Sequence, residues 1–382
     1  MAMRPSSVIS RAQKIASQDL RAGYREAGIM AGITHFDDFW ARDAFFASWG
    51  ALALGDFGKV RQNLDLFLSY QRSDGLIPRR LNRYYGGAYF KYLTNLRLKA
   101  CRPRPVFWGN GGFPDTDPNA LLVITASFYA KATNDRAWVS RHKFKLQKAL
   151  EWLTSQDFDR DGLINEGPYS NWLDTIKKFS GLGTVLYSNV LALSALKAGD
   201  DLGIDHEHWV KSPAQILTRL RQRLWTGQFF AAWASGPART EVFDVPGNLL
   251  GVVLRIFSAE ETKCILAHLK HCLADELLPA TNYPAYAKTM VHFYHKLDRL
   301  TGYHNNYARW LWVSALYAVA LKQDGQTTRA KAVIERGARW INKYGTVCEV
   351  YRPNGEPYNG LTWKSERSFA WSAGLFLWAM GE

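Results

Sequence analysis

The sequence predicts an all-α fold in a single domain that spans residues 1–382. Apolar residues recur at i, i+3, i+4, i+7 spacing along most of the chain, which is typical of amphipathic helices. The alternation of apolar and polar residues that marks a half-buried strand is almost absent. No shift in composition marks a linker, and 47% hydrophobic residues are enough for one sizeable core.

About a dozen segments carry the helical spacing. The expected helices span residues 39–54, 56–71, 117–133, 136–155, 184–199, 206–224, 245–257, 259–273, 284–300, 305–323, 326–343 and 366–380. The basic stretch ahead of them, "MAMRPSSVISRAQKIASQDL", has no continuous apolar run. This argues against a secretory signal, and we expect a plain first helix there; because the stretch contains Arg and Ser and few acids, a transit peptide is the alternative.

The connections between these helices are of two kinds. Turns such as "LGDFGK" and "KQDGQ" are short, as expected within antiparallel helical hairpins. Other connections are long and rich in Gly, Pro and aromatic residues, among them "KACRPRPVFWGNGGFPDTD" and "DFDRDGLINEGPYSNWLDT". Short turns at one end and long loops at the other predict helical hairpins arranged in a ring, with a pocket at the loop-rich end.

The chain is strongly basic, with 48 Lys and Arg against 34 Asp and Glu and a net charge of +14. The basic residues are spread out and no nucleic-acid-binding motif accompanies them, so we expect a solvated basic surface and no nucleic-acid partner. The sequence has no long uninterrupted apolar segment, so no membrane-spanning helix is expected. The cysteines show no metal-binding spacing, which favours reduced thiols in a cytoplasmic protein: Cys101, Cys264, Cys272 and Cys348.

The motif "DFDRDGLI" matches the first half of a calcium-binding loop, with Asp157, Asp159 and Asp161 as oxygen donors. The twelfth position of such a loop is Pro168 here, so the bidentate Glu is missing. We therefore expect a turn held by Asp side chains, with Gly162 in the left-handed region, and no bound Ca²⁺. Nucleotide-binding glycine loops and nucleophile motifs are also missing from the sequence, so no cofactor is expected.

Aromatic residues make up 14% of the chain, and many lie beside acids in the long loops, as in "HFDDFWARD", "SNWLDT" and "NGLTWKSE". An aromatic ring covers the apolar face of a pyranose while carboxylates bind its hydroxyls, so this pattern predicts a saccharide pocket. The carboxylates of these segments are Asp37, Asp38, Asp43, Asp115, Asp117, Asp174, Glu349, Glu356 and Glu366.

Asp174 is distinguished among these acids because it directly follows Trp172 and Leu173. Glycoside hydrolysis needs one protonated carboxyl group and one ionised carboxylate. An apolar neighbourhood raises the pKa of a carboxyl group and keeps it protonated near neutral pH. The residue types alone leave Asp174 equally open to a role in capping the loop.

Five segments, in order along the chain, resemble those of the six-hairpin (α/α)6-toroid glycoside hydrolases. "FWARDAFFAS" is similar to the W-x-R-D-x-F segment of that group, and "PDTDPNALLV" to its V-D-A-[ST]-L-x-[FV] segment. "DRDGLINEGPYSNWLDT" resembles D-G-L-I-x(n)-W-M-D, and "GYHNNYARWLW" resembles Y-H-N-G-x-x-W-P-W. "CEVYRPNGEP" and "SFAWSAG" together resemble the closing S-E-[IVL]-[YF]-x(n)-Q-A-W-S-x-A segment. The likeness is greatest to the amylo-α-1,6-glucosidase domain of glycogen-debranching enzymes, with kinship to glucoamylases, trehalases and processing α-glucosidases.

The resemblance implies that Asp174 is the general acid and Glu349 the general base of an inverting hydrolase, with carboxyls about 6.5–9.5 Å apart. Glu366, just before the closing aromatic segment, is an alternative base. Trp40 and Trp172 would form walls of the pocket. The other residues that the resemblance places around the sugar are Arg42 and Asp43 on its hydroxyls, His304 at the rim, Asp117, Asn171, Glu366 and Trp371.

The activity implied by the resemblance is the exo-acting release of a terminal α-glucosyl unit from a small saccharide. The substrate and its linkage stay open, and the basic net charge favours a substrate with an anionic group. One alternative is a sugar isomerase or epimerase on the same toroid; such enzymes use His pairs, and the long acidic loops hold no His. Another is a saccharide-binding protein without catalytic activity.

Overall fold

The computed structural model describes residues 5–85, 99–109, 111–204 and 211–382. Its long helices are α1 (Pro5–Ala22), α2 (Ala41–Ala53), α3 (Phe57–Ser69), α5 (Asp117–Thr133), α6 (Arg136–Thr154), α7 (Leu186–Asp201), α8 (Pro213–Leu224), α9 (Val245–Val253), α10 (Ala259–Leu273), α12 (Leu311–Gln323), α13 (Thr327–Tyr344) and α14 (Ala370–Gly381). Two short helical turns, η1 and α11, span Lys288–Met290 and Phe293–Leu297. No helix in the described ranges is both long and apolar enough to cross a membrane.

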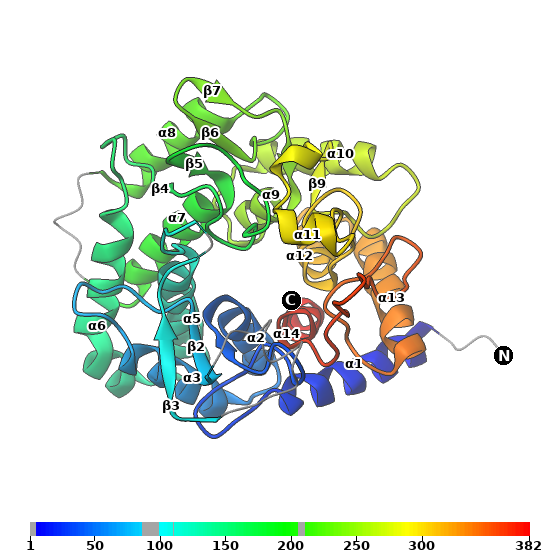
Figure 1. Ribbon diagram of the computed structural model, residues 1–382, viewed down its shortest axis with the longest axis horizontal. Helices are drawn as coiled ribbons and strands as arrows, with labels where there is room; N and C mark the ends of the chain where they lie inside the picture. Colours follow the sequence, from blue (N-terminus) through cyan, green and yellow to red (C-terminus); the bar gives the residue numbers. More distant parts are fainter. Residues whose placement is uncertain (1–4, 86–98, 110, 205–210) are drawn as a thin grey trace.

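The long helices form a closed ring, in sequence order around the molecule (Figure 1). Among the described residues, an inner set of helices lies around the centre, and each packs against the next until α14 meets α2: α2, α5, α7, α9, α12 and α14. An outer set packs against the inner one: α1, α3, α6, α8, α10 and α13. The first helix, α1, completes the outer set by packing against α13 and α14.

The two sets differ in burial, as the sequence dictates. Helices α12 and α14 are apolar all round and are buried on nearly every side. Helix α13 is amphipathic and buries one face only. Gly50 of α2 and Gly374 of α14 lie so close together that a Cβ atom at Gly50 would overlap the Gly374 backbone. The close packing of α2 on α14 therefore depends on glycine at these positions.

Short antiparallel strands lie in the connections. They are β1 (Phe39–Trp40), β2 (Arg80–Tyr84) and β3 (Lys99–Val106) in one sheet, β4 (Asn165–Glu166), β5 (Gly183–Val185), β6 (Trp233–Ser235) and β7 (Ala238–Arg239) in a second, and β8 (Phe243–Asp244) with β9 (Asn282–Tyr283). In the first sheet, β1 pairs with β2 and places Trp40 opposite Arg80. Most of these strands are too short to show alternation, so the sequence did not reveal them.

Most predicted helices are confirmed, including the plain first helix. The prediction of one helix over residues 284–300 was wrong, because only Phe293–Leu297 forms an α-helix there. Its apolar spacing does not correspond to one buried face, since Phe293 and Leu297 are exposed. The helix predicted over 305–323 begins only at Leu311, and the one over 206–224 begins at Pro213, with residues 206–210 outside the described ranges.

Candidate active site

A cavity of about 360 Å³ lies beside the N-terminal ends of three inner helices, α2, α12 and α14. Trp40, Trp310 and Phe369, which directly precede these helices, all line it. The lining residues within the described ranges are His35, Phe36, Trp40, Arg42, Asp43, Arg80, Trp172, Asp174, Thr175, His295, Leu300, Tyr303, His304, Trp310, Glu349, Trp363, Phe369 and Trp371. The ring thus brings segments from across the chain to one pocket.

The cavity gathers most of the site residues that the sequence predicted. Those that line it are Trp40, Arg42, Asp43, Trp172, Asp174, His304, Glu349 and Trp371. Three others, Asp117, Asn171 and Glu366, are buried but do not line it.

Asp174 lies between two basic side chains. Its Oδ2 atom is 3.2 Å from Nη2 of Arg79, and its Oδ1 atom is 3.9 Å from Nδ1 of His304. The apolar neighbourhood expected from Trp172 and Leu173 is only part of the setting, because the guanidinium of Arg79, 95 positions earlier in the chain, also contacts Asp174. The Asp174 side chain is 20% exposed, which leaves it accessible from the cavity.

A chain of alternating charges continues from Arg79 into the protein. Nε of Arg79 is 3.0 Å from Oδ2 of Asp115, and the same oxygen is 3.2 Å from Nη2 of Arg42. Arg42 also donates from Nε to Oδ2 of Asp117 at 2.5 Å. Burial raises the pKa of Asp115 to about 6 against the opposing effect of the two arginines. Asp117, which was predicted to contact sugar, instead accepts the hydrogen bond from Arg42 and does not line the cavity.

A buried polar network supports the loop that carries Asp174. Asn171, with a positive φ of 63°, donates to Glu166 and accepts a hydrogen bond from the backbone N–H of Leu173 at 2.9 Å. Lys178 lies beneath the loop and donates to the backbone oxygen of Ser170 at 2.7 Å. Asn171 therefore shapes the turn before Asp174, and its side chain does not reach the cavity.

Glu349 is enclosed far more completely than Asp174. It accepts a hydrogen bond from the hydroxyl of Tyr303 and another, at 3.2 Å, from the backbone N–H of Glu366. Burial raises the pKa of Glu349 well above its ordinary value, although the Tyr303 hydroxyl acts in the opposite direction. Asp43, in the first turn of α2, is a third carboxyl group at the cavity, and burial raises its pKa to about 7.

The Glu366 carboxylate points to the segment of residues 33–36 instead of the cavity. Its oxygens accept hydrogen bonds from the backbone N–H groups of that segment and from the hydroxyl of Thr34, and Oε2 lies 2.8 Å from Nδ1 of His35. Burial alone would raise its pKa, but the contacts with His35 and Thr34 lower the pKa of Glu366 to about 2. These contacts favour Glu349 over Glu366 as a base. They also show how Glu366 holds His35 and Phe36 at the pocket wall.

Aromatic rings form much of the wall. Trp371 stacks on Trp312 with ring centroids 4.3 Å apart, and Trp172 meets Trp312 edge to face at 5.1 Å. Within the described part of the chain, three indole N–H groups of the lining are buried and have no hydrogen-bond partner: those of Trp40, Trp172 and Trp371. Buried donors without a partner are rare, so these three are suited to bind the hydroxyls of a ligand.

Histidines take a larger part in the cavity than the sequence suggested. His304 is buried in the wall and not at the rim, and it shares a hydrogen bond of 2.8 Å with Thr175. His295 also lines the cavity, with its ring centroid 6.5 Å from that of His304. Burial lowers the pKa of both imidazoles, so both are neutral at pH 7.

Sequence reasoning missed several residues that contribute to the site. Arg80 begins β2 and Arg79 directly precedes it, in a segment that the sequence suggested to be a long loop with part of a dispersed basic surface. Tyr303 belongs to the matched "GYHNNYARWLW" segment, but nothing in that segment identifies Glu349 as its partner. Trp363, which meets Tyr303 edge to face at 5.0 Å, lies in the aromatic segment "NGLTWKSE" and could have been found from it.

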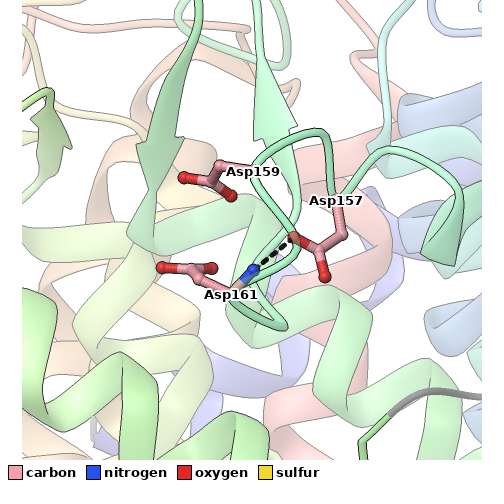
Figure 2. A group of neighbouring side chains, drawn as sticks. All are labelled: Asp157, Asp159 and Asp161. Carbon is pink, nitrogen blue, oxygen red and sulfur yellow. Dashed lines mark hydrogen bonds between the residues drawn. The ribbon is translucent and has the colours of Figure 1, made fainter.

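The predicted Asp turn forms, and its three Asp residues are not among those that line the cavity. Carboxylate oxygens of Asp157, Asp159 and Asp161 come within 4.8 Å of one another. Figure 2 shows the Asp157 carboxylate accepting the backbone N–H of Asp161, and the other oxygen accepts that of Gly162 at 2.8 Å. Asp161 lies 3.0 Å from Nε of Arg219. These bonds account for the turn, with Gly162 at a φ of 96°.

Comparisons with known proteins agree with this architecture. A family model described as amylo-alpha-1,6-glucosidase matches residues 7–96. The GH63 mannosylglycerate hydrolase of Thermus thermophilus, solved with Tris and D-glycerate, is 14% identical, with a TM-score of 0.72 over 96% of this chain and 99% of that one. The same hydrolase solved with glucose is 15% identical, with a TM-score of 0.70 over the same shares.

A wild-type glycosidase is similar as well, at 13% identity and a TM-score of 0.70 over 99% of this chain and 98% of that one. No curated protein sequence matches the chain. The chain has the fold of these glycosidases.

Proposed function

We propose that this protein is an inverting, exo-acting glycoside hydrolase on a six-hairpin (α/α)6 toroid, which releases a terminal α-glucosyl unit from a short saccharide. The observation that carries the proposal is that Asp174 and Glu349 line one cavity, although they lie far apart in the sequence. Indole donors and aromatic faces surround them, as a pyranose requires. The similarity to glycosidases, one of them solved with glucose, supports the same class of reaction.

In the proposed reaction, Asp174 acts as general acid and gives its proton to the oxygen of the leaving group as the bond from C1 to that oxygen breaks. Glu349 acts as general base and takes a proton from a water molecule, whose oxygen forms the new bond to C1. The configuration at C1 is inverted because water attacks from the side opposite to the leaving group. Arg42 and Asp43 would bind the hydroxyls of the glucosyl unit, with Trp172 and Trp371 around it and Trp40 at its boundary with the leaving group.

The size of the cavity favours a small substrate. Its volume of about 360 Å³ is near the lower end of the usual range for ligand pockets. A terminal sugar with a small leaving group fits that volume better than an internal segment of a long glucan. This volume supports exo-acting hydrolysis of a short saccharide.

A sugar isomerase or epimerase is the second candidate, and the neighbouring His295 and His304 favour it. Both imidazoles are neutral at pH 7 and border the cavity, so either could take a proton from a sugar carbon. However, the hydrogen bond with Thr175 already occupies Nδ1 of His304, which is one of the ring nitrogens of these two histidines.

A panel of α-linked glucosides followed by ¹H NMR tests the proposal. The panel contains trehalose, maltose, isomaltose, sucrose and glucosylglycerate. Hydrolysis with inversion releases β-glucose first, and mutarotation then forms the α-anomer. α-Glucose as the first product contradicts inversion, an epimerised sugar supports the second candidate, and tight binding without turnover supports a saccharide-binding protein.

A further inference from the structure

Three arginines at or beside the cavity differ in their partners. Arg42 contacts Asp115 and Asp117, and Arg79 contacts Asp115 and Asp174, so both guanidinium groups are balanced by carboxylates. Arg80 also lines the cavity, but no carboxylate of the described residues lies within ion-pair distance of it. Within the described part of the chain, Arg80 is therefore a cation at the cavity that lacks an anion.

The position of Arg80 is fixed by the first sheet. Arg80, in β2, pairs with Trp40, in β1. The guanidinium carbon of Arg80 lies 4.4 Å from the centroid of the Trp40 ring. Its Nε atom is buried without a hydrogen-bond partner among the described residues, and so is the indole N–H of Trp40 beside it. Two side chains that lie against each other at the cavity thus each carry a donor that is out of contact with water.

Burial of this guanidinium is costly. Desolvation lowers the pKa of Arg80 to about 10, so the side chain is still charged at neutral pH. Asp38 and Asp174 stabilise this charge from a distance, but each is engaged elsewhere. Asp38 accepts the backbone N–H of Arg83 at 2.7 Å, and Asp174 faces Arg79. A buried charge that lacks a close partner gains most from a ligand that supplies one.

The neighbours of Arg80 indicate which part of a substrate it would meet. Arg79, the preceding residue, contacts Asp174, which we propose to protonate the leaving group. The charge of Asp174 also acts on Arg80. The guanidinium groups of Arg79 and Arg80 both lie over the Trp40 ring, and Arg80 lines the same cavity as Asp174, so we place Arg80 on the aglycone side of the bond that breaks.

We infer that Arg80 and the indole N–H of Trp40 form a subsite for an anionic group on the aglycone, a carboxylate or a phosphate monoester. The substrate would be an α-glucoside of a small hydroxy acid or of a hydroxyalkyl phosphate. A guanidinium binds either anion through two N–H groups at once, and Trp40 holds its plane in place. This inference rests on the proposed hydrolysis of an α-glucoside.

The test compares three α-glucosides that differ only in the end of the aglycone: carboxymethyl, 2-phosphoethyl and neutral 2-hydroxyethyl. The readout is the ratio of kcat/KM for each anionic glucoside to that for the neutral one, measured for each variant. The wild-type protein should prefer one anionic glucoside by about 10-fold or more, and Arg80→Gln should bring that ratio close to one. The preferred glucoside distinguishes a carboxylate from a phosphate.

Arg104→Gln is the matched control, because it removes the same charge from an exposed arginine of β3 that also faces an aromatic ring, Tyr85. The control should keep the wild-type ratio. Wild-type protein without an anionic preference, or Arg80→Gln with the preference intact, would overturn the inference.

A binding measurement separates this inference from the proposed function. If none of the glucosides is hydrolysed, the proposed function fails, and Arg80 can still be tested with free anions. Tryptophan fluorescence should then report binding of glycolate or of inorganic phosphate to the wild-type protein, with at least about 10-fold weaker binding to Arg80→Gln. Ethylene glycol serves as the neutral control. Equal binding of the anion by both proteins would overturn the subsite.

Discussion

The two carboxyl groups of the proposed acid and base pair are held in opposite ways. Asp174 is partly exposed and faces Arg79, at the end of a chain of charges that runs through Asp115 to Arg42. Glu349 is buried and is held by one hydroxyl and one backbone N–H, without a basic side chain in contact with it in the described structure.

The two carboxyls therefore differ in burial and in partners, although they line one cavity. The arginine chain fixes the position of Asp174 and leaves it open to a leaving group. Burial holds the pKa of Glu349 well above its ordinary value, so Glu349 can act as a base only once the pH exceeds that raised pKa. The ionisation of Glu349 should therefore largely determine how activity depends on pH.

Removal of either carboxylate should have the largest effect. Asp174→Asn and Glu349→Gln should each lower kcat by about 10²- to 10⁴-fold on a glucoside that the wild-type protein hydrolyses, because each removes one proton transfer. Circular dichroism should show that both variants are folded. Glu356→Gln, a change at an exposed loop acid, should keep wild-type turnover, and near-wild-type turnover by both site variants would end the assignment.

Loss of Arg79 tests the charge chain behind Asp174. Arg79→Gln should lower kcat by about 10- to 100-fold with a smaller change in KM, because Asp174 loses the contact that orients it. Arg79→Lys keeps the charge and should recover part of kcat. A purely structural role for Arg79 would instead give equal losses in both variants, together with a lower melting temperature.

Removal of the Tyr303 hydroxyl tests the Glu349 side. The hydrogen bond from Tyr303 lowers the pKa of Glu349, so Tyr303→Phe should raise that pKa further. Because a base acts in its ionised form, the acid limb of the kcat/KM profile should move to higher pH, by about one unit. Tyr307→Phe, at an exposed position, is the control. If the acid limb does not move, Tyr303 does not influence the group whose pKa sets that limb.

Glu366 should affect stability more than chemistry. Its pKa of about 2 in the folded protein lies below the ordinary value of 4.5. Its contribution to stability is therefore present above pH 4.5 and is lost as the pH falls through 2. Glu366→Gln should lower the free energy of unfolding by about 3 kcal/mol near neutral pH, measured by urea denaturation, and should flatten its dependence on pH between 4.5 and 2. A kcat loss as large as that of Glu349→Gln would contradict this role.

The sequence predicted the ring of helices well because helical periodicity is a local signal. Amphipathic helices such as α13 carry it, whereas buried helices such as α12 are nearly continuous apolar runs that are long enough to indicate a helix. The segment 284–300 carries the spacing without one buried face, and only the tertiary structure shows that Phe293 and Leu297 face solvent.

The site was predicted in part, for a physical reason. Asp174 and Glu349 stand in recognisable aromatic segments, but their partners come from elsewhere in the chain. Arg79 lies 95 residues from Asp174, and Tyr303 lies 46 residues from Glu349. Glu366 resembled a base because its partners, the backbone N–H groups of residues 33–36, lie more than 300 residues away.

The assignment of acid and base is tested most directly with α-glucosyl fluoride. Fluoride leaves without needing a proton, so a general acid is dispensable for this substrate while a general base is still required. The account predicts that Asp174→Asn hydrolyses α-glucosyl fluoride at close to the wild-type rate, whereas Glu349→Gln stays inactive. The reverse pattern, with Glu349→Gln active on the fluoride and Asp174→Asn inactive, would contradict the account and exchange the two roles.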